Sequence, residues 1–156
     1  MTELRQLFSD LVRLEIELWD AVDRRLRERC GLSMGFFDVM QTVARTPSCR
    51  VHDIARQLSI TVGGTSKAVD RAEAAGHLVR RANPGDRRSS IVELTASGAQ
   101  VLEQAFAVVD EELEARLGRV LPPGALERFG AAIAAVRSAG LAASAGEDDQ
   151  PPSTRG

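Results

Sequence analysis

Hydrophobic residues recur every three or four positions over the first part of the chain, which predicts a helix of about six turns with one continuous apolar stripe. The stripe comprises Leu4, Leu7, Leu11, Leu14, Leu18, Val22 and Leu26. Such a stripe is too long to be only the internal face of a small domain. We therefore expect part of it to pack against another chain.

A second helix should follow after a short break. Gly31 is the expected C-terminal cap of the first helix, and Ser33 is the expected N-cap of the next. The second helix should extend over residues 34–45, because the Thr-Pro dipeptide that follows does not favour helix. Its buried face should carry Phe37, Met40 and Val43.

Residues 51–78, VHDIARQLSITVGGTSKAVDRAEAAGHL, predict two short helices with a tight joint, which is the helix-turn-helix pattern. Gly76 should end the second of these helices. Ile54, Ala55 and Leu58 should form an apolar face on the first helix, which Val62, Val69 and Ala72 continue on the second. Ile60 should bridge the turn between them. An ordinary pair of packed helices remains the alternative at this point.

The pattern then changes from helical to extended. The segments LVRRA and SSIVEL flank the turn sequence NPGD and predict a β-hairpin, with Val92 and Leu94 on one side. Thr95 is the expected N-cap of a long helix with apolar positions at Val101, Leu102, Ala105, Phe106, Val109, Leu113 and Leu117. Two prolines should end it, and a last helix should carry Leu126, Phe129, Ile133 and Val136.

These elements predict a mainly α fold with a small β-hairpin wing, in which long N- and C-terminal helices flank a winged helix-turn-helix core. Residues 1–140 should form a single domain, with the winged helix at 48–95 and dimerisation helices at 1–30 and 96–140. Residues 141–156 have no packing face and are expected to be a disordered tail. The apolar surface of the long helices favours a homodimer.

Charge is unevenly distributed along the chain. Residues 50–88 contain eight arginines or lysines and four acidic residues, although the whole protein has a formal net charge of −2. A basic middle part between acidic ends is typical of an anion-binding module, but a solvated charged face would have the same composition. No apolar run is long enough for a membrane helix and no export signal is present, so we expect a cytoplasmic protein.

A winged helix gives the basic residues two separate tasks on DNA. The second helix of the pair can enter a major groove, and arginines at the hairpin tip can enter the adjacent minor groove, where the negative potential is high. Asp86 could pair with either tip arginine and hold the loop in shape. Near the start of the helix, the residues expected to face outward are Thr61, Thr65, Ser66 and Lys67. The full set of expected DNA contacts is Thr61, Gly63, Gly64, Thr65, Ser66, Lys67, Arg71, Arg87 and Arg88.

The two adjacent glycines have two possible explanations. Glycine costs a helix roughly 1 kcal/mol relative to alanine, so Gly63 and Gly64 need a reason to stand near the start of a helix. Close approach of the backbone to phosphates or base edges would supply it. The alternative is that they only loosen the first turn.

The run DIARQLSITVGGTSKAVDRAEAAGHLVRRANPGDRRSSIVELTASG resembles the core of the MarR family of bacterial transcriptional regulators. The resemblance includes the Asp-x-Arg wing motif and the Leu-Thr-x-x-Gly entry to the next helix, and it covers residues 1–140. The motif residues are Asp86 and Arg88, and Leu94, Thr95 and Gly98. The resemblance implies a homodimer that binds a pseudo-palindromic operator, usually as a repressor, and is released by a small ligand.

The resemblance also implies an effector site between the dimer helices and the winged helix, often for aromatic or phenolic acids. The candidate residues are Arg13, Trp19, Phe36, Asp38 and Met40. The spacing of Trp19, Asp38 and Arg71 is similar to that in the urate-responsive subgroup of the family. Alternatively, Trp19 anchors the core or an interface, and Asp38 pairs with an arginine.

Other chemistry finds little support in the sequence. Cys30 and Cys49 have no CxxC spacing, and His52 and His77 lie far apart, so we expect no metal site and no cofactor. The peroxide-sensing branch of the family depends on a cysteine in the first helix and on tyrosines, whereas this chain has no tyrosine. Thiol sensing is therefore not expected, although Cys49 could be exposed in its loop.

Two other classes of function compete with DNA binding. No nucleophile with a base in reach, phosphate loop or paired carboxylates can be identified, which argues against an enzyme. A winged helix used only for dimerisation or protein partner binding, without DNA readout, is the remaining alternative. It predicts an apolar or acidic outer face on the second helix, and the sequence shows a polar one.

Overall fold

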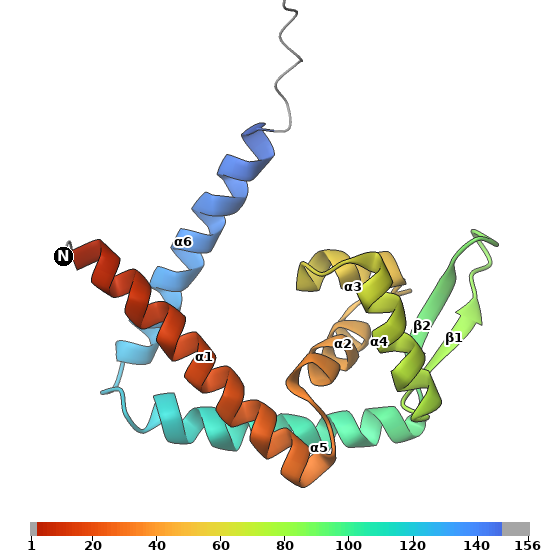
Figure 1. Ribbon diagram of the computed structural model, residues 1–156, viewed down its shortest axis with the longest axis horizontal. Coiled ribbons are helices and arrows are strands. Elements are labelled where there is room, and N and C mark those ends of the chain that lie inside the picture. The colour runs from red at the N-terminus through yellow and green to blue at the C-terminus, as the bar shows by residue number, and fades with distance from the viewer. Residues whose placement is uncertain (1–2, 148–156) are drawn as a thin grey trace, which may run out of the picture. The chain divides into compact units, whose positions relative to one another are not determined.

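The computed structural model describes residues 3–147, and the chain divides into two compact units, Met1–Leu113 and Glu114–Gly156. The first unit contains α1 (Glu3–Cys30), α2 (Met34–Arg45), α3 (Val51–Leu58), α4 (Val62–Ala74), β1 (Leu78–Ala82), β2 (Ser90–Leu94) and α5 (Ala96–Leu113) (Figure 1). The second unit contains a π-helical turn, Glu114–Gly118, and α6 (Ala125–Glu147). The predicted class, a mainly helical fold with a two-stranded antiparallel hairpin, is confirmed.

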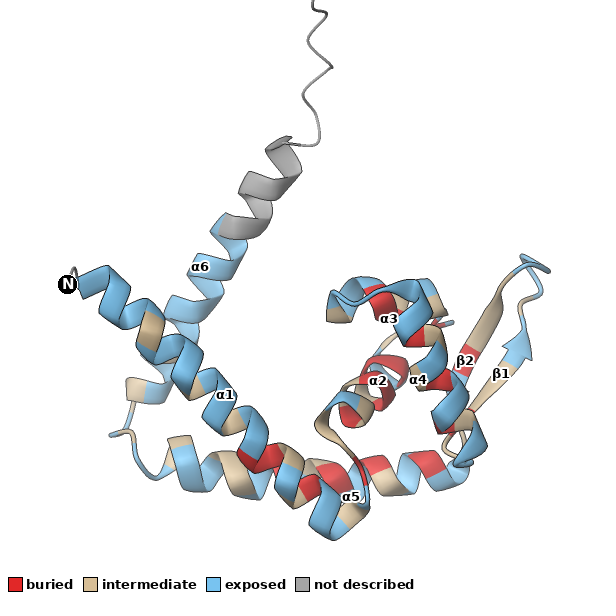
Figure 2. Cartoon of the chain, viewed as in Figure 1, coloured by how far each residue is buried: buried red, intermediate tan, exposed pale blue. Residues whose placement is uncertain are grey.

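Within the first unit, α2 is the central element because it packs on both sides. Figure 1 shows α2 between the crossed helices α1 and α5 and the α3–α4 pair. Its residues Phe37 and Met40 join a core cluster with Leu26 of α1 and Leu102 of α5. On its other side, Val39 and Val43 join a second cluster, whose remaining members are Cys49, Ile54, Val69, Ala72, Leu78 and Val92. The buried residues of α2 in Figure 2 therefore connect the long helices to the winged helix.

The junction of α1 and α2 is formed as the sequence predicts. Gly31 has a φ of +68°, the left-handed conformation that glycine adopts without strain, and the Ser33 hydroxyl accepts the Phe36 N–H at 3.2 Å. The Asp23 carboxylate accepts the backbone N–H of Met34 at 2.7 Å. Hydrogen bonds from the Arg27 guanidinium and from that N–H lower the pKa of Asp23. One side chain of α1 thus fixes the start of α2.

The hairpin joins α5 through an unusually close backbone approach. The strands pair with Leu78 opposite Leu94, and the Thr95 hydroxyl accepts the Gly98 N–H at 2.9 Å while it donates to the Gly76 carbonyl at 2.6 Å. A Cβ placed on Gly98 would lie 2.0 Å from the His77 carbonyl oxygen. Glycine is required at this position because any side chain would collide with a backbone atom that cannot rotate away.

Some boundaries and orientations differ from the predictions. Val62 was predicted to continue the apolar face but is 42% exposed, and Ile60, predicted to bridge the turn, is 44% exposed. Ser59 in the left-handed conformation, with a φ of 54°, turns the chain so that these two residues lie on the surface of the joint. Helix α5 ends at Leu113 rather than beyond Leu117, because the backbone widens there into the π-helical turn.

The predicted disordered tail is also partly wrong. Helix α6 continues through residues 141–147, where disorder was expected. This segment is rich in alanine, which has the highest intrinsic helix propensity, and contains no proline. The rest of the predicted tail, residues 148–156, lies outside the described residues.

Substitution Gly98→Ala should lower the free energy of unfolding by about 2 kcal/mol or more, because the added methyl group must displace the His77 carbonyl. Gly130→Ala is the matched control, since a Cβ there meets nothing within 4 Å and alanine favours helix. Thermal and urea unfolding of both variants measure the difference. An unchanged stability of the Gly98 variant would contradict the close approach.

Candidate nucleic-acid interface

The start of α4 is built around Thr61. Its hydroxyl accepts the Gly64 N–H at 3.1 Å, and its carbonyl accepts both the N–H and the hydroxyl of Thr65 at 2.9 Å. Thr65 is fully buried, so the prediction that it faces outward is wrong. The reason is helical phase, because Thr65 lies four residues before buried Val69 and shares its face. Thr65 therefore supports the helix start from inside.

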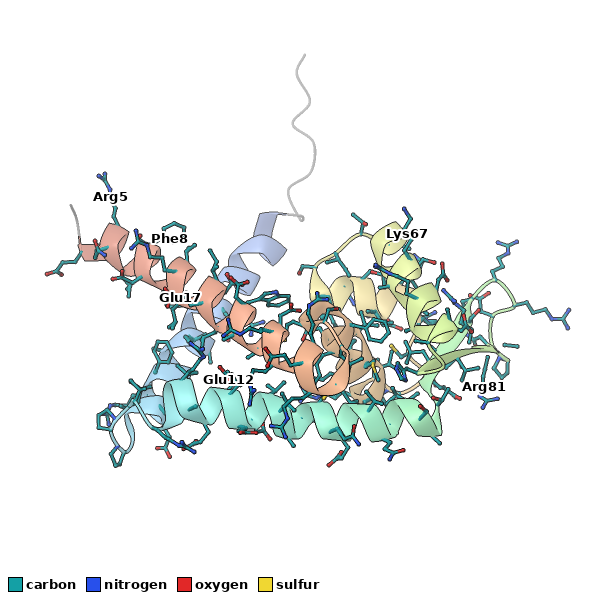
Figure 3. The ribbon with its side chains drawn as sticks, turned by 60° about the horizontal axis from the view of Figure 1, so that its bottom comes forward. Arg5, Phe8, Glu17, Lys67, Arg81 and Glu112 are labelled. Carbon is teal, nitrogen blue, oxygen red and sulfur yellow. The ribbon has the colours of Figure 1, made fainter. Side chains whose placement is uncertain are left out.

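The outward face of α4 is open and carries little side-chain volume near its start. Gly63 is exposed, and a Cβ placed there would meet nothing within 4 Å. A Cβ on Gly64 would lie 3.1 Å from the Thr61 hydroxyl that caps the helix. One turn after Gly63, Lys67 projects away from the helix into solvent (Figure 3). Nothing inside the described protein thus explains a glycine at residue 63.

Half of the basic residues of segment 50–88 are neutralised by carboxylates. Arg50 and Arg56 both contact Asp53, Arg80 contacts Asp70 and Glu73, and Arg81 contacts Glu93. The others have no carboxylate partner among the described residues: Lys67, Arg71, Arg87 and Arg88. These four are the cationic residues that the sequence predicts to contact DNA. The excess positive charge is therefore concentrated on the outer face of α4 and on the hairpin loop.

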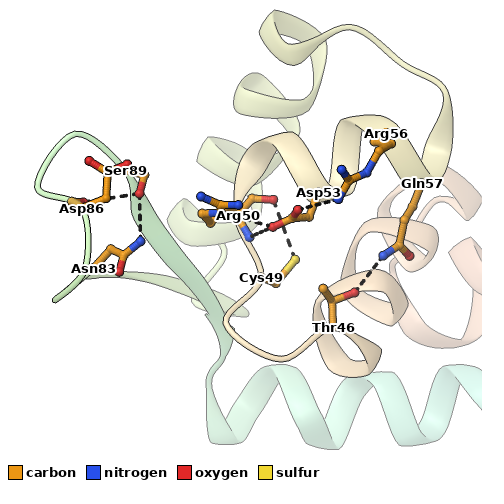
Figure 4. Close-up of polar contacts among 9 residues, drawn as sticks. All are labelled: Thr46, Cys49, Arg50, Asp53, Arg56, Gln57, Asn83, Asp86 and Ser89. Carbon is orange, nitrogen blue, oxygen red and sulfur yellow. Dashed lines mark hydrogen bonds and ion pairs between the residues drawn. The ribbon is translucent and has the colours of Figure 1, made fainter.

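The hairpin loop, residues 83–89, is held by its own polar groups (Figure 4). The Asn83 side chain accepts the Gly85 N–H at 3.0 Å and donates to the Ser89 hydroxyl at 2.9 Å. The Asp86 carboxylate accepts the backbone N–H of Arg88 at 2.9 Å. Asp86 was predicted to pair with an arginine side chain, but within the described residues it binds this backbone group instead. The loop is shaped without engaging the guanidinium groups of Arg87 and Arg88.

Arg80 ties the hairpin to α4, a role that the sequence reasoning missed. Its guanidinium donates to Glu73 at 2.5 Å and to Asp70 at 2.7 Å, and its backbone N–H donates to Glu73 at 2.9 Å. The backbone and side-chain hydrogen bonds from Arg80 lower the pKa of Glu73. Arg80 therefore fixes the position of the hairpin, which carries Arg87 and Arg88, relative to α4, which carries Lys67 and Arg71.

A separate cavity of about 260 Å³ lies where the end of α1 and the start of α2 meet α4. Its charged and aromatic lining residues are Arg27, Phe36, Arg71 and His77. Phe36 and His77 pack edge to face with ring centroids 6.2 Å apart. The buried Nδ1 of His77 has no hydrogen-bond partner among the described residues. Two guanidinium groups beside two aromatic rings suit a small aromatic anion.

The structure does not bring the predicted effector residues together. Phe36 alone of these residues lines the cavity, and fully buried Met40 belongs to the core. Arg13 and Trp19 are exposed on α1, and Asp38 is half-buried, where burial raises its pKa. Sequence reasoning missed Arg27 and His77, which come from segments far apart in the chain.

The structure gives little support for chemistry at the Cys49 thiol. Cys49 is buried, so the prediction that it could be exposed in its loop is wrong, and burial together with nearby Asp53 raises its pKa to about 11. Its thiol is thus protonated and shielded at neutral pH.

Across residues 3–147, no cluster of three or more histidine, cysteine or acidic side chains could hold a metal ion. Over the same residues, no helix has the length and apolar character needed to span a membrane.

Comparisons with known proteins agree with this geometry. The MarR family model matches residues 31–89. The multiple antibiotic resistance protein MarR of Escherichia coli K12 is 32% identical over 127 residues, which cover 78% of this chain and 88% of that protein. Sco3205, a MarR family regulator from Streptomyces coelicolor solved in complex with DNA, has a TM-score of 0.79 at 24% identity, with 89% of each chain covered.

Two further solved structures are of proteins named CouR, one with DNA and one with a small ligand. The transcriptional repressor CouR bound to a 23-mer DNA duplex has a TM-score of 0.79 at 26% identity, with 88% of this chain and 96% of that chain covered. CouR from Rhodococcus jostii RHA1, bound to p-coumaroyl-CoA, has a TM-score of 0.70 at 21% identity, with 81% of this chain and 87% of that chain covered. On this similarity in sequence and fold, the chain belongs to the MarR family of winged helix-turn-helix, DNA-binding transcriptional regulators.

Proposed function

We propose that this regulator is a homodimeric repressor that binds a pseudo-palindromic operator and releases it when a small aromatic acid binds. The observation that carries the proposal is the distribution of unpaired positive charge. Within segment 50–88, the cations without carboxylate partners among the described residues lie on α4 and on the hairpin loop, and these are the two elements that a winged helix directs at adjacent grooves.

On this proposal, α4 enters the major groove of each half-site. Gly63 allows the backbone to approach base edges or phosphates, and Lys67 and Arg71 contact the strand beside it. Thr61, Gly64 and Ser66 complete this surface, whereas buried Thr65 shapes the start of the helix. The hairpin loop, shaped by Asp86, carries Arg87 and Arg88 to the minor groove.

The exposed apolar residues of α1 support a homodimer. They lie in the part of α1 that the core does not cover, and each is at least 40% exposed: Leu4, Leu7, Phe8, Leu11, Val12, Ile16 and Trp19. In α6, described by itself, Leu126, Ile133 and Val136 are also at least 40% exposed. A contiguous apolar stripe of this kind is rare on a monomer, and a second copy of the same stripe would cover it. We assign residues 1–30 and 96–140 to dimerisation, as parts of one functional domain over 1–140.

Two observations support the proposed repressor mode and the proposed effector: the solved CouR structures and the cavity beside α4. One protein named CouR is described as a repressor, and CouR from Rhodococcus jostii RHA1 is bound to p-coumaroyl-CoA, an aromatic acyl thioester, which supports an aromatic acid or its thioester as the effector class of this chain. The cavity beside Arg27 and Arg71 offers cations for a carboxylate and the Phe36 and His77 rings for stacking.

Replacing both loop arginines, Arg87→Gln with Arg88→Gln, should weaken binding to the DNA flanking the protein's own gene by about 100-fold, because two cations leave the minor groove. Gel-shift titration measures this loss. Unfolding temperature and the dimer mass from light scattering should not change, since both residues are exposed and neither contacts a described carboxylate. Unchanged DNA binding would reject the wing assignment, and a monomer mass for the wild type would reject the two-fold arrangement.

Substitution Gly63→Ala should stabilise the free protein by up to about 1 kcal/mol and weaken operator binding by about tenfold or more. The added methyl group favours helix and meets no atom of the protein, but it occupies the space that DNA must enter. Gly35→Ala is a matched control, because Gly35 is also the second residue of its helix and also has open space around it. That control should gain similar stability and bind DNA normally. A Gly63 variant with full affinity would place the glycine outside the DNA contact.

Phe36→Ala with Arg27→Gln should leave operator binding within about threefold while abolishing release by aromatic acids, because the cavity loses a ring and a cation. Fluorescence-anisotropy release assays with a panel of benzoates, cinnamates and their thioesters measure the effect. Trp19→Phe serves as the control, since Trp19 does not line this cavity. Release that survives in the double variant would exclude the cavity as the effector site.

A further inference from the structure

A cleft of about 270 Å³ lies between the start of α3, the start of α4 and the hairpin. Its polar lining consists of cationic groups and hydroxyls, and no carboxylate residue lines it. The groups that matter are the guanidiniums of Arg50, Arg80 and Arg88, the imidazole of His52, and the hydroxyls of Ser66 and Ser90. A lining of this composition suits an anion that accepts several hydrogen bonds.

The charges around the cleft leave it positive. Asp53 is shared by two guanidiniums, since Arg56 lies 2.9 Å from one of its oxygens and Arg50 lies 3.5 Å from the other (Figure 4). One carboxylate therefore faces two cations. Arg88 adds another cation with no carboxylate partner among the described residues. Arg80 is held at the wall of the cleft by Asp70 and Glu73, whose two negative charges exceed its single positive charge by one. Arg50, Arg56 and Arg88 against Asp53 exceed their acid by two, so the surroundings of the cleft keep a net positive charge.

The position of the cleft suggests what the anion is. Adjacent major and minor grooves of a duplex are separated by one sugar–phosphate strand. A duplex that receives α4 in one groove and the hairpin loop in the next must therefore pass that strand between the two elements. The cleft lies between these elements, so a phosphate of that strand would come to its mouth.

We propose that this cleft holds one backbone phosphate of each half-site, bound by Arg50 and Arg88 with help from His52, Ser66 and Ser90. The proposal rests on the proposed function and adds the start of α3 to the DNA-contacting surface. It also separates the two loop arginines, because Arg88 lines the cleft whereas Arg87 does not. This inference refines the assignment of both loop arginines to the minor groove, with Arg88 on the strand phosphate and Arg87 in the groove.

The first test compares Arg50→Gln with Arg56→Gln. These arginines share Asp53 and differ in that only Arg50 lines the cleft, so both variants alter the same ion-pair cluster. Arg50→Gln should weaken binding by about tenfold on operator and unrelated DNA alike, and it should lower the slope of log K against log salt by about 0.9 per half-site. Arg56→Gln should change neither quantity. Equal behaviour of the two variants, or an unchanged salt slope for Arg50→Gln, would overturn the proposal.

The second test locates the phosphate by neutral methylphosphonate substitution at each position of the operator. Several positions per half-site should weaken wild-type binding, and at one of them Arg50→Gln should cause no further loss. If the losses add at every position, Arg50 does not bind a single phosphate and the proposal fails. If wild-type binding requires the loop arginines but Arg50→Gln leaves the DNA affinity unchanged, this inference alone is rejected. A wild type that fails to bind any duplex would reject the proposed function as well.

Discussion

The hairpin and α4 can act on one duplex only if the spacing between them is fixed, and Arg80 is the residue that fixes it. Its backbone N–H and guanidinium both bind Glu73, and the guanidinium also binds Asp70. Charge-assisted hydrogen bonds of this kind impose direction as well as attraction, so the strand cannot rotate on the helix without breaking several of them. The groove spacing of DNA is constant, and a rigid protein surface meets it at a lower entropic cost than a mobile one.

The same contacts explain how an acidic protein can present a basic surface. Asp70 and Glu73 lie on α4, the helix proposed to contact DNA, where free carboxylates would repel phosphates, and the ion pairs with Arg80 offset one of these two negative charges. The acidic side chains of this region are thus ion-paired with arginines that shape the fold. The unpaired cations remain available to attract phosphates. A formal net charge of −2 therefore says little about the local potential that a duplex would meet.

The sequence predicted those features that depend on local chemistry. Capping by Gly31, Ser33 and Thr95 was predicted because each cap acts within a few residues of its own position. The burial of Thr65 was missed because its helical phase depends on which face meets the core. The pairing of basic residues was also missed, since Arg80 and Asp70 are ten positions apart and meet only when the hairpin folds onto α4. The cavity residues Arg27 and His77 are more distant still.

Arg71 connects the two proposed sites, because it lies on α4 among the unpaired cations and also lines the effector cavity. A carboxylate bound in the cavity would attract the guanidinium, which would then be less available to a phosphate. DNA and the effector would compete for one cation, and by linkage each would weaken the other to the same extent. A single charge-assisted hydrogen bond contributes about 1.5–3 kcal/mol, and the proposed dimer would have two such sites, so losing both would weaken DNA binding by at least 100-fold. Repression could then be relieved without any large movement of the winged helix, a mechanism that suits a hairpin and helix held rigidly together by Arg80.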